Sequence, residues 1–302
     1  MKIIAGIITH NRSELLVRCL ENVLNQTRKL DKILIIDNGS TDNTSEILKN
    51  YNIDYIYQEN NGSAAGWNKA IELALNKKFD LIWLMDDDGF PALNSLEILE
   101  KNFSNEFSCL SSVAVDENKH NLFTFPYPHL NLYNVPVIFK LKRKFKYLDD
   151  LTSNSKNFLY NYANLFNGAL ISMEAVKKIG NVNKDFFIYG EEVDFFYRLR
   201  DYGKVYSYIK SIHYHPNVNR RPLNQIKIYY FIKNTLILNK KYFNIYLIRN
   251  ILTVGVILYR ILIRNGVIDF LNYTFGKKNK IIILAIKNAI YNKIEKDFIA
   301  KY

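Results

Sequence analysis

The sequence predicts an α/β fold in which an open sheet flanked by helices precedes a basic, largely helical C-terminal region. Three observations support this prediction. Strand-like and helix-like segments alternate over residues 1–115, hydrophobic residues make up 48% of the 302-residue chain, and basic residues accumulate after residue 216. We therefore expect a domain at 1–216 and a separate region at 217–302.

Apolar runs and amphipathic segments alternate in the first 85 residues. The runs with the length and composition of buried strands are 2–9, 32–36, 54–58 and 80–85. The segments with apolar residues at helical spacing are 13–26, 43–50 and 64–77, and Ser13 is placed to cap the first of them. This alternation is typical of an open sheet with parallel strands, which binds ligands at the carboxyl ends of its strands. We expect the polar loops at those ends to converge, and these loops are 9–12, 37–42 and 86–89.

The pattern is less regular in the second part of the domain. Prolines at 126, 128 and 136 and a basic run at 140–146 predict that 116–165 is a long insertion loop over the site, although a solvated surface excursion has the same pattern. After it, we expect a strand at 167–172, a helix at 191–202 and a strand at 205–214.

The net charge of +12 resides in the C-terminal region. Residues 217–302 contain 16 Lys and Arg but only three Asp and Glu, whereas residues 1–216 contain 25 basic and 26 acidic residues. The uncharged run 250–259 has about half of the roughly 20 residues that span a bilayer. We expect helices that lie in the plane of an anionic membrane. Packing on the domain at 1–216 or on a second copy, as a homo-oligomer, is the alternative. The long aliphatic segments argue against nucleic-acid binding.

The cysteines and the N-terminus indicate a cytoplasmic protein. Cys19 and Cys109 stand among apolar residues, outside any metal-binding spacing, which suits buried thiols in a reducing compartment. The apolar run 3–8 is too short and too soon interrupted for a signal peptide. With the basic region, these features predict a peripheral protein on the inner face of the cytoplasmic membrane.

Three consecutive carboxylates, Asp86, Asp87 and Asp88, follow the apolar run 81–85 at a predicted strand end. Adjacent carboxylates repel one another unless a cation lies among them, and oxygen ligands suit Mg²⁺ or Mn²⁺. A turn after the strand can direct Asp86 and Asp88 to one point. We therefore expect this pair to bind a metal ion, the alternative being a solvated turn.

Further acidic and imidazole groups suit the same chemistry. Glu191, Glu192 and Asp194 begin a predicted helix, where they either provide a general base or stabilise the helix dipole. His213 and His215 close a strand downstream, and a neutral imidazole is a good metal ligand.

Two other segments suit a nucleotide. Asp37, at a strand end, can hydrogen-bond a base or ribose, and Gly39 allows the chain to approach a ligand closely. The small residues of 60–66 open a helix whose backbone N–H groups can accept phosphate. The segment lacks the Gly-Lys-Ser/Thr of a Walker A loop, so phosphate binding would come chiefly from the metal.

Together and in this order, these motifs resemble those of family-2 glycosyltransferases with a GT-A fold. The residues that carry the resemblance are 9–12, 37–44, 61–71, 84–89, 167–169, 187–198 and 213, with a weaker similarity at 228–241. The Asp-Asp-Asp-Gly form at 86–89 is most similar to bacterial galactofuranosyl- and rhamnosyltransferases, which build surface polysaccharides from nucleotide sugars. The resemblance covers about residues 1–216 and implies a mixed, Rossmann-like sheet.

The resemblance implies roles for individual residues. Those implied in donor or nucleotide binding are Thr9, Arg12, Asp37, Trp67, Asn68 and Asp86. Those implied in Mn²⁺ or Mg²⁺ binding are Asp86, Asp88 and His213, with His215 as the alternative. Glu192 corresponds to the second member of the family's acidic pair, the catalytic base, although Glu in place of Asp lengthens the arm by one methylene. Those expected near the acceptor are Asp194, Gly168 and Glu191.

The expected reaction is an inverting, metal-dependent hexosyl transfer. The donor is of the UDP-galactofuranose, UDP-galactose or dTDP-rhamnose type, and the acceptor is a hydroxyl of a saccharide or lipid-linked saccharide. The metal would neutralise charge on the departing diphosphate while Glu192 takes the acceptor's proton. One rival is a nucleotidyltransferase acting on sugar phosphates, but the chain lacks the Gly-rich, Lys-bearing N-terminal loop expected for it. A catalytically inactive membrane-associated scaffold is the other, and the complete set of acidic residues argues against it.

Overall fold

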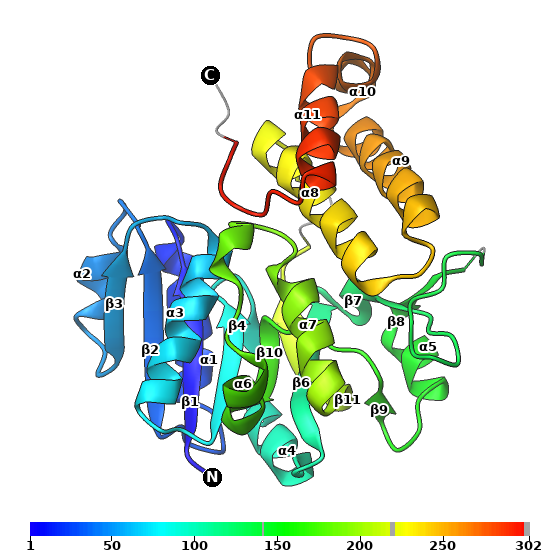
Figure 1. Ribbon diagram of the computed structural model, residues 1–302. Coiled ribbons are helices and arrows are strands. Elements are labelled where there is room, and N and C mark those ends of the chain that lie inside the picture. The colour runs from blue at the N-terminus through cyan, green and yellow to red at the C-terminus, as the bar shows by residue number, and fades with distance from the viewer. Residues whose placement is uncertain (141, 218–220, 299–302) are drawn as a thin grey trace. The chain divides into compact units, whose positions relative to one another are not determined.

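The computed structural model describes residues 1–140, 142–217 and 221–298 (Figure 1). The chain divides into two compact units. Unit 1 comprises Met1–Val182 and Phe195–Asn217, and unit 2 comprises Asn183–Asp194 and Val218–Tyr302. The segment Asn183–Asp194 therefore groups with the C-terminal helices, which the predicted boundary at 216 did not anticipate. The functional roles of the two regions stay predictions.

The N-terminal half of unit 1 has the predicted alternation of elements. Its strands and helices are β1 (Ile3–Thr9), α1 (Ser13–Leu24), β2 (Lys32–Asn38), α2 (Thr44–Leu48), β3 (Asp54–Gln58), α3 (Ser63–Asn76) and β4 (Leu81–Asp86). The strands are parallel, in the order β3-β2-β1-β4, with Thr9 level with Asp37 and Ile8 level with Asp86. This register brings the three polar loops to the same edge of the sheet.

The predicted cap of α1 is wrong. Arg12 occupies the N-cap position and makes no side-chain capping hydrogen bond, while Ser13 is the first helical residue. The backbone N–H of Ser13 donates instead to Oδ2 of Asp42 at 3.2 Å. The loop after β2 thus supplies an acceptor that the start of a helix requires.

The second half of the sheet is partly antiparallel, so the sheet is mixed and open as predicted. Its strands and the helices beside them are β5 (Phe90–Pro91), α4 (Ser95–Asn102), β6 (Phe107–Asp116), β10 (Asn167–Ser172), α6 (Met173–Ile179), α7 (Glu191–Tyr202) and β11 (Lys204–His215). A short 3₁₀ turn, Lys184–Phe186, precedes α7. Strand β10 is antiparallel to β4 and β6, and β11 is parallel to β6, giving the order β3-β2-β1-β4-β10-β6-β11-β5.

The prediction that 116–165 is a loop is wrong, because the segment forms further elements of the sheet. These are β7 (Lys119–Pro128), β8 (Lys144–Tyr147), α5 (Leu148–Ser153) and β9 (Leu159–Tyr160). Strand β7 pairs with both β6 and β8. The side chains of Phe123, Tyr127 and Phe145 are buried with those of β6 in one apolar cluster. This burial explains why the segment is ordered despite its prolines.

Helices cover both faces of the sheet in unit 1 (Figure 1). On one face, α1 and α4 pack against alternate residues of β1 and β4 in the main apolar cluster. On the other face α3 approaches β1 so closely that a Cβ at Gly66 would lie 2.8 Å from Cγ2 of Ile8. Cys19 and Cys109 are buried thiols, as predicted.

Unit 2 is helical outside the segment before α7. Its helices are α8 (Gln225–Tyr242), α9 (Tyr246–Asn265), α10 (Val267–Thr274) and α11 (Asn279–Ile290), and they share one apolar cluster. Within the part of the chain that the structure describes, α9 is the one helix long and apolar enough to cross a membrane, by length and composition alone. It has 20 residues and extends well beyond the predicted uncharged run.

A charged pair is enclosed among these helices. The side chain of Lys233 is fully buried, and its Nζ lies 2.6 Å from Oδ1 of Asp297 and 2.8 Å from the carbonyl oxygen of Glu295. Burial lowers the pKa of Lys233, and the hydrogen bond to Asp297 opposes that shift. The pair ties the segment after α11 to α8.

Candidate functional site

The loops at the carboxyl ends of β1, β2 and β4 meet, as predicted. Oδ1 of Asn11 accepts hydrogen bonds from the backbone N–H groups of Thr41 at 2.7 Å and Asp42 at 3.3 Å. The φ angle of Asn11 is 51°, in the left-handed region that Asn tolerates better than most residues. Asn11 thus joins the first loop to the second.

Asp87 joins the first loop to the third. Its Oδ2 accepts from the Thr9 hydroxyl at 2.7 Å, and its Oδ1 accepts from Nη1 of Arg12 at 2.9 Å. Burial raises the pKa of Asp87, while Arg12 and Thr9 oppose the shift. Burial would lower the pKa of Arg12, but the charges of Asp87 and Asp88 raise it overall. Thr9 and Arg12, predicted to hold the nucleoside, therefore hold Asp87, and 41% of the Arg12 side chain remains exposed.

Asp88 faces His215. Oδ1 of Asp88 lies 3.0 Å from Nε2 of His215, and Nδ1 of His215 lies 2.8 Å from the carbonyl oxygen of Pro216. Because a carbonyl only accepts, Nδ1 carries a proton, and Nε2 is the ring nitrogen that faces Asp88. Two electron-rich atoms at this distance need a proton or a cation between them. A histidine oriented through its other nitrogen by a carbonyl is typical of metal ligands.

His213, the ligand predicted from the resemblance, is placed differently. Its ring is fully buried, and neither ring nitrogen has a hydrogen-bond partner among the residues described. A Cβ at Gly89 would collide with Nε2 of His213, and a Cβ at Gly168 would lie 3.1 Å from Nδ1. Burial, with a smaller effect of His215, lowers the pKa of His213 to about 3, so the ring is neutral at pH 7. The structure brings the alternative, His215, to Asp88, and a ligand role for His213 stays a prediction.

The metal-ligating atoms of Asp88 and His215 suit a cation that also binds a ligand. Over residues 1–140, 142–217 and 221–298, no group of three or more His, Cys, Asp or Glu side chains is arranged to hold a metal ion. The 3.0 Å between Asp88 Oδ1 and His215 Nε2 equals the spacing of adjacent ligands around an octahedral ion with bonds of about 2.1 Å. Mg²⁺ sites commonly combine one or two protein ligands with water and substrate phosphate. The residues therefore fit Mg²⁺ or Mn²⁺ accompanied by a diphosphate.

Asp86 ends β4 and Asp37 lies near the end of β2, the two strands that flank β1. Asp86 is half-buried, and its backbone N–H donates to the carbonyl oxygen of Phe166 at 3.0 Å. Asp37 is buried, and its two oxygens accept from the Ser40 N–H at 2.8 Å and the Tyr55 hydroxyl at 3.0 Å. Burial and this bond raise the pKa of Tyr55 to about 12, so Tyr55 is a donor at neutral pH. Carboxylate oxygens have further lone pairs, so a bond from Asp37 to a ribose stays a prediction.

Trp67 and Asn68 of α3 make contacts within the scaffold. The Trp67 ring is 1% exposed and stacks on Phe166, with centroids 4.1 Å apart and planes 7° apart. Nδ2 of Asn68 donates to the carbonyl oxygen of Val182 at 2.7 Å, and the carbonyl oxygen of Asn68 accepts from Nδ2 of Asn181 at 2.8 Å. These contacts support the chain before β10 and after α6, and donor binding by the two residues stays a prediction.

Gly168 forms a bulge in β10. Its φ angle is 81°, and a Cβ there would lie 3.1 Å from Oγ of Ser112 as well as from the His213 ring. A side chain at this position would therefore be strained and crowded. The predicted role of Gly168 near the acceptor stays a prediction.

The predicted catalytic acids begin α7 and belong to unit 2. Asp194 is buried, and its Oδ1 accepts from Nζ of Lys241 at 2.6 Å and from the Tyr242 hydroxyl at 2.7 Å. Glu191 is buried, and Glu192 is more exposed than either neighbour in this acidic group. Asp194 is thus engaged with α8, whereas Glu192 has the more accessible carboxylate.

Helix α8 also holds the loop that precedes these acids. Nδ2 of the fully buried Asn234 lies 3.0, 3.0 and 2.6 Å from the carbonyl oxygens of Phe186, Ile188 and Tyr189. The φ angles of Phe187 and Tyr189 are 63° and 60°, a conformation that costs on the order of 1 kcal/mol for each non-glycine residue. The Asn234 amide offsets this strain and fixes the chain that leads into Glu191 and Glu192.

The sequence analysis did not predict three residues that support the site, namely Asp87, Tyr55 and Arg18. Nη2 of Arg18 donates to the carbonyl oxygen of Asp88 at 2.9 Å. Asp87 stands in the turn after β4, where strand alternation no longer fixes the direction of a side chain, and Nη1 of Arg12 contacts both Asp87 and Asp88. Arg18 and Tyr55 gave no signal, since their partners lie 70 and 18 residues away along the chain.

Comparison with known sequences agrees with this geometry. The model of Glycosyl transferase family 2 matches residues 5–167. Galactofuranosyltransferase GlfT1 of Mycolicibacterium smegmatis is 30% identical over 200 residues, which are 65% of this chain and 64% of that protein. Glycosyltransferase GlyG of Streptococcus pneumoniae is 34% identical over 96 residues, 30% of this chain and 31% of that protein. The chain thus matches less than two thirds of the length of these relatives.

Solved structures share the fold. S. aureus TarS 1–349 superposes with a TM-score of 0.57 at 13% identity, covering 97% of this chain and 81% of that one. The same fragment in complex with UDP gives 0.52 at 12% identity, covering 92% and 74%. The mixed sheet and these neighbours confirm the predicted GT-A fold. Because the family model extends over more than half of the sequence, the chain belongs to glycosyl transferase family 2.

Proposed function

We propose that the protein is an inverting, metal-dependent hexosyltransferase that acts in bacterial surface polysaccharide synthesis. It moves a sugar from a nucleoside-diphosphate sugar to a hydroxyl of a saccharide or lipid-linked saccharide. The observation that carries this proposal is the pair of Asp88 and His215, 3.0 Å apart at the edge of the sheet where ligands bind, beside the partly exposed Arg12. Family membership supplies the reaction class.

Asp88 and His215 are the residues that would hold Mn²⁺ or Mg²⁺, with Asp86 at the same strand end. When bound, the metal supplies Lewis-acid stabilisation of the departing diphosphate. Arg12 lies 3.2 Å from Asp88 and keeps two fifths of its side chain exposed, so its guanidinium is available to a phosphate oxygen. Asp87 orients Arg12 for this purpose through the bond at 2.9 Å.

Glu192 is the proposed general base. It accepts the proton of the acceptor hydroxyl while that oxygen bonds to the anomeric carbon of the sugar. The bond from the anomeric carbon to the diphosphate oxygen breaks, and its electron pair leaves with the nucleoside diphosphate. Because the incoming and departing oxygens occupy opposite sides of the carbon, the configuration inverts. Asp194 is less suited to this role because Lys241 and Tyr242 already bind its carboxylate.

The donor we favour is UDP-galactofuranose, with UDP-galactose and dTDP-rhamnose as alternatives. Support comes from the galactofuranosyltransferase named among the relatives and from UDP in the complex of the structural neighbour. The +13 balance of residues 217–302 supports a peripheral location on the inner face of the cytoplasmic membrane, where a lipid-linked acceptor is available.

Thermal unfolding with UDP, dTDP, GDP and CMP, each with and without Mn²⁺, tests the donor site. A ligand at one hundred times its dissociation constant adds about 2.7 kcal/mol to the free energy of unfolding. We expect a Mn²⁺-dependent shift with UDP in the wild type, which Asp88→Ala and His215→Ala lose. Glu72→Ala, an exposed acidic position on α3, is the matched control and keeps the shift. The absence of a shift with every nucleotide would contradict the proposal.

A further inference from the structure

The outward face of α9 is apolar. Residues exposed at intervals of about one turn are Ile248, Ile251, Gly255, Tyr259 and Ile263, and four of these five have apolar or aromatic side chains. Two of the three arginines of α9 pack on aromatic rings: the guanidinium of Arg260 lies 5.0 Å from the ring centroid of Phe231, and that of Arg249 lies 4.0 Å from the ring centroid of Phe243. In a soluble helix the charged residues face water and the apolar stripe faces the core. Helix α9 departs from this arrangement, because it is apolar on its exposed face as well as on the face that packs in the core.

The two following helices extend the pattern. Exposed apolar residues in α10, at its end and in α11 are Val267, Ile268, Leu271, Phe275, Ile283, Leu284, Ile290 and Tyr291. We call these residues and the stripe of α9 the apolar surface. Isolated exposed apolar residues are ordinary, but a concentration on consecutive helices marks an interaction site.

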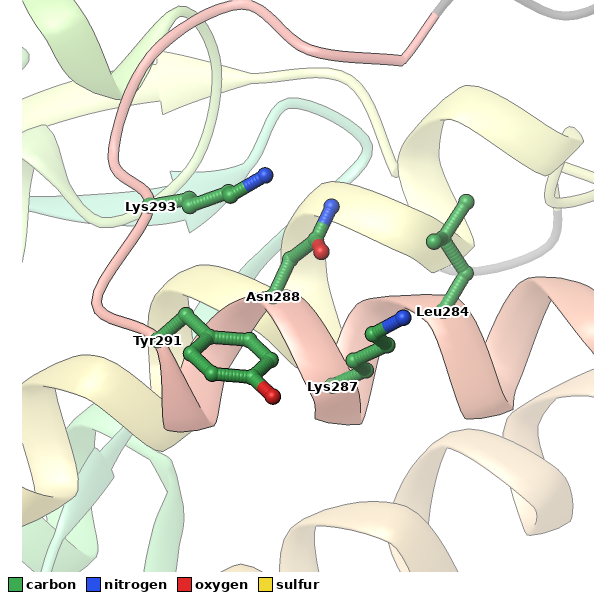
Figure 2. A pocket seen from close by; sticks show the side chains of 5 residues that line it. All are labelled: Leu284, Lys287, Asn288, Tyr291 and Lys293. Carbon is green, nitrogen blue, oxygen red and sulfur yellow. The ribbon is translucent and has the colours of Figure 1, made fainter.

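Positive charge accompanies the apolar surface. A surface hollow of about 480 Å³ on and beside α11 is lined by Leu284, Lys287, Asn288, Tyr291 and Lys293. Figure 2 shows Asn288 between the two lysine side chains. The nearby Asp297 is paired with Lys233 at 2.6 Å and accepts from Asn288 at 2.9 Å, so its charge is balanced internally. Two ammonium groups and a phenol around a hollow suit a phosphate group.

We propose that unit 2 docks in the plane of an anionic lipid surface through the apolar surface, with a lipid phosphate in the hollow. The positive charge of residues 217–302 indicates which partner binds the apolar surface. A second copy would oppose one strongly basic region with another, since residues 217–302 hold 16 basic and three acidic residues. An anionic bilayer complements both the apolar side chains and the lysines. The docking deepens the membrane location within the proposed function.

An in-plane orientation follows from the packing of α9. Its other face is buried against the unit, with Ile257 and Ile261 in the shared apolar cluster. If α9 crossed the bilayer, the helices α8 and α10 packed on it would enter the hydrocarbon with their charges, including Lys240 of α8 and Asp269 of α10. Charged side chains in that region are strongly disfavoured. Lying in the interface, α9 immerses its exposed stripe together with the exposed apolar side chains of α10 and α11, while the charged side chains of the unit stay in water.

Sedimentation with vesicles tests the docking on the full chain. We expect binding to phosphatidylcholine vesicles that contain about one third phosphatidylglycerol, weaker binding at high salt, and little binding to phosphatidylcholine alone. Ile268→Ser/Phe275→Ser should weaken binding at least tenfold, because both side chains are exposed and lose a favourable transfer into lipid. Leu132→Ser/Phe139→Ser changes similar, equally exposed residues in unit 1 and should bind as the wild type does.

Lys287→Gln/Lys293→Gln tests the hollow. It should reduce the preference for phosphatidylglycerol about tenfold and leave the weak binding to neutral vesicles unchanged. The alternative is that the hollow binds free phosphate. Binding of millimolar inorganic phosphate that the lysine substitutions abolish, together with unchanged vesicle binding of the same variant, would show this and contradict the lipid assignment.

Other outcomes would also overturn the proposal. These are unchanged binding of Ile268→Ser/Phe275→Ser, loss of binding in the unit 1 control, and retention on vesicles after alkaline carbonate, which would indicate a spanning helix. A dimer in light scattering that the same double substitution dissociates would identify a second copy as the occupant. The UDP shift separates the two proposals. Wild-type protein that binds vesicles but shows no nucleotide shift would sustain the docking and contradict the transferase site, whereas a double variant that keeps the UDP shift but loses vesicle binding would support both.

Discussion

Replacing Asp87 by Asn should weaken donor binding and leave the fold about as stable as before. The amide has nearly the same shape, and its oxygen can still accept from the Thr9 hydroxyl, but the charge that holds Arg12 is lost. The raised pKa of Asp87 means that burial disfavours its charge by more than Arg12 and Thr9 compensate. Removing that charge relieves an unfavourable burial while it weakens one ion pair. We therefore expect the free energy of unfolding to change by less than about 1 kcal/mol.

Asp87→Ala is the matched contrast. It leaves the buried Thr9 hydroxyl without its acceptor and opens a small space, and we expect a loss of about 2–3 kcal/mol. The ion pair with Arg12 adds little to that figure, because 41% of the Arg12 side chain is exposed and its interaction is screened. The two variants therefore separate the charge of Asp87 from its hydrogen bond.

The pH dependence has a definite sign. A carboxyl whose pKa is raised by folding stabilises the fold in its protonated form, fully below its ordinary pKa of 3.8, and this contribution is lost as pH rises through the raised value. Asp87→Asn should remove this dependence and flatten stability in the pH range just above 3.8.

Urea unfolding followed by circular dichroism and calorimetric titration of UDP with Mn²⁺ measure the two effects. With Arg12 no longer held, UDP affinity should fall about tenfold, which corresponds to about 1.4 kcal/mol. Our reasoning would be refuted by an Asp87→Asn variant that unfolds at much lower urea and binds UDP as the wild type does. The charge would then serve the fold rather than the donor.

Further predictions concern the base, the buried pair and the α3 tryptophan. Glu192→Gln should keep UDP and Mn²⁺ binding and lose about three orders of magnitude in kcat. Asp194→Asn should instead lower the stability of the fold and keep the turnover per folded molecule. Equal losses of kcat in the two variants would contradict the assignment of Glu192 as the general base. Asp297→Ala should destabilise unit 2 by about 3 kcal/mol, because it leaves Lys233 buried without its partner, and the double substitution Lys233→Met/Asp297→Leu should recover most of that loss. Hydrogen exchange of the backbone amides in α8 measures both effects. Protection of Asp297→Ala equal to that of the wild type would contradict a stabilising role of the pair. Trp67→Ala should cost about 3–4 kcal/mol on thermal unfolding with no change in the UDP dissociation constant, and a selective loss of UDP affinity would place the ring at the donor.

The parallel half of the sheet could be predicted closely. Strands β1 to β4 begin and end within two residues of their predicted limits, because apolar runs bounded by polar turns have few other interpretations. The meeting of their loops follows from parallel topology. Strand β7 could not be predicted in the same way. Its prolines at 126 and 128 suggest a loop, and only the pairing with β8 and the burial of Phe123 and Tyr127 make it a strand.

Within the site, the sequence predicted that the loops after β1, β2 and β4 meet, but not how their side chains pair. His213 and His215 are two residues apart on one strand, so an alternating pattern places both on the same face. They differ in their neighbours: His213 lies against the glycines at 89 and 168, whereas His215 reaches Asp88. Long-range packing decides that difference. The engagement of Asp194 by Lys241 likewise depends on a helix 47 residues away along the chain.

The amide of Asn234 restricts how this protein can recombine with its relatives. A recombination with a relative at residue 216, the boundary between the near-neutral and the basic part of the sequence, would join the loop before α7 to the α8 of another protein. That helix would need a side-chain amide at the position of Asn234 to bind the same three carbonyl oxygens. A crossover after Val182 keeps loop and helix together but also transfers β11 and its histidines, because the two units interleave along the chain. No single exchange therefore transplants the C-terminal helices alone. Their sequence and the acidic turn at 191–194 should therefore be inherited as one block, and a substitution in this turn should be accompanied by substitutions in α8.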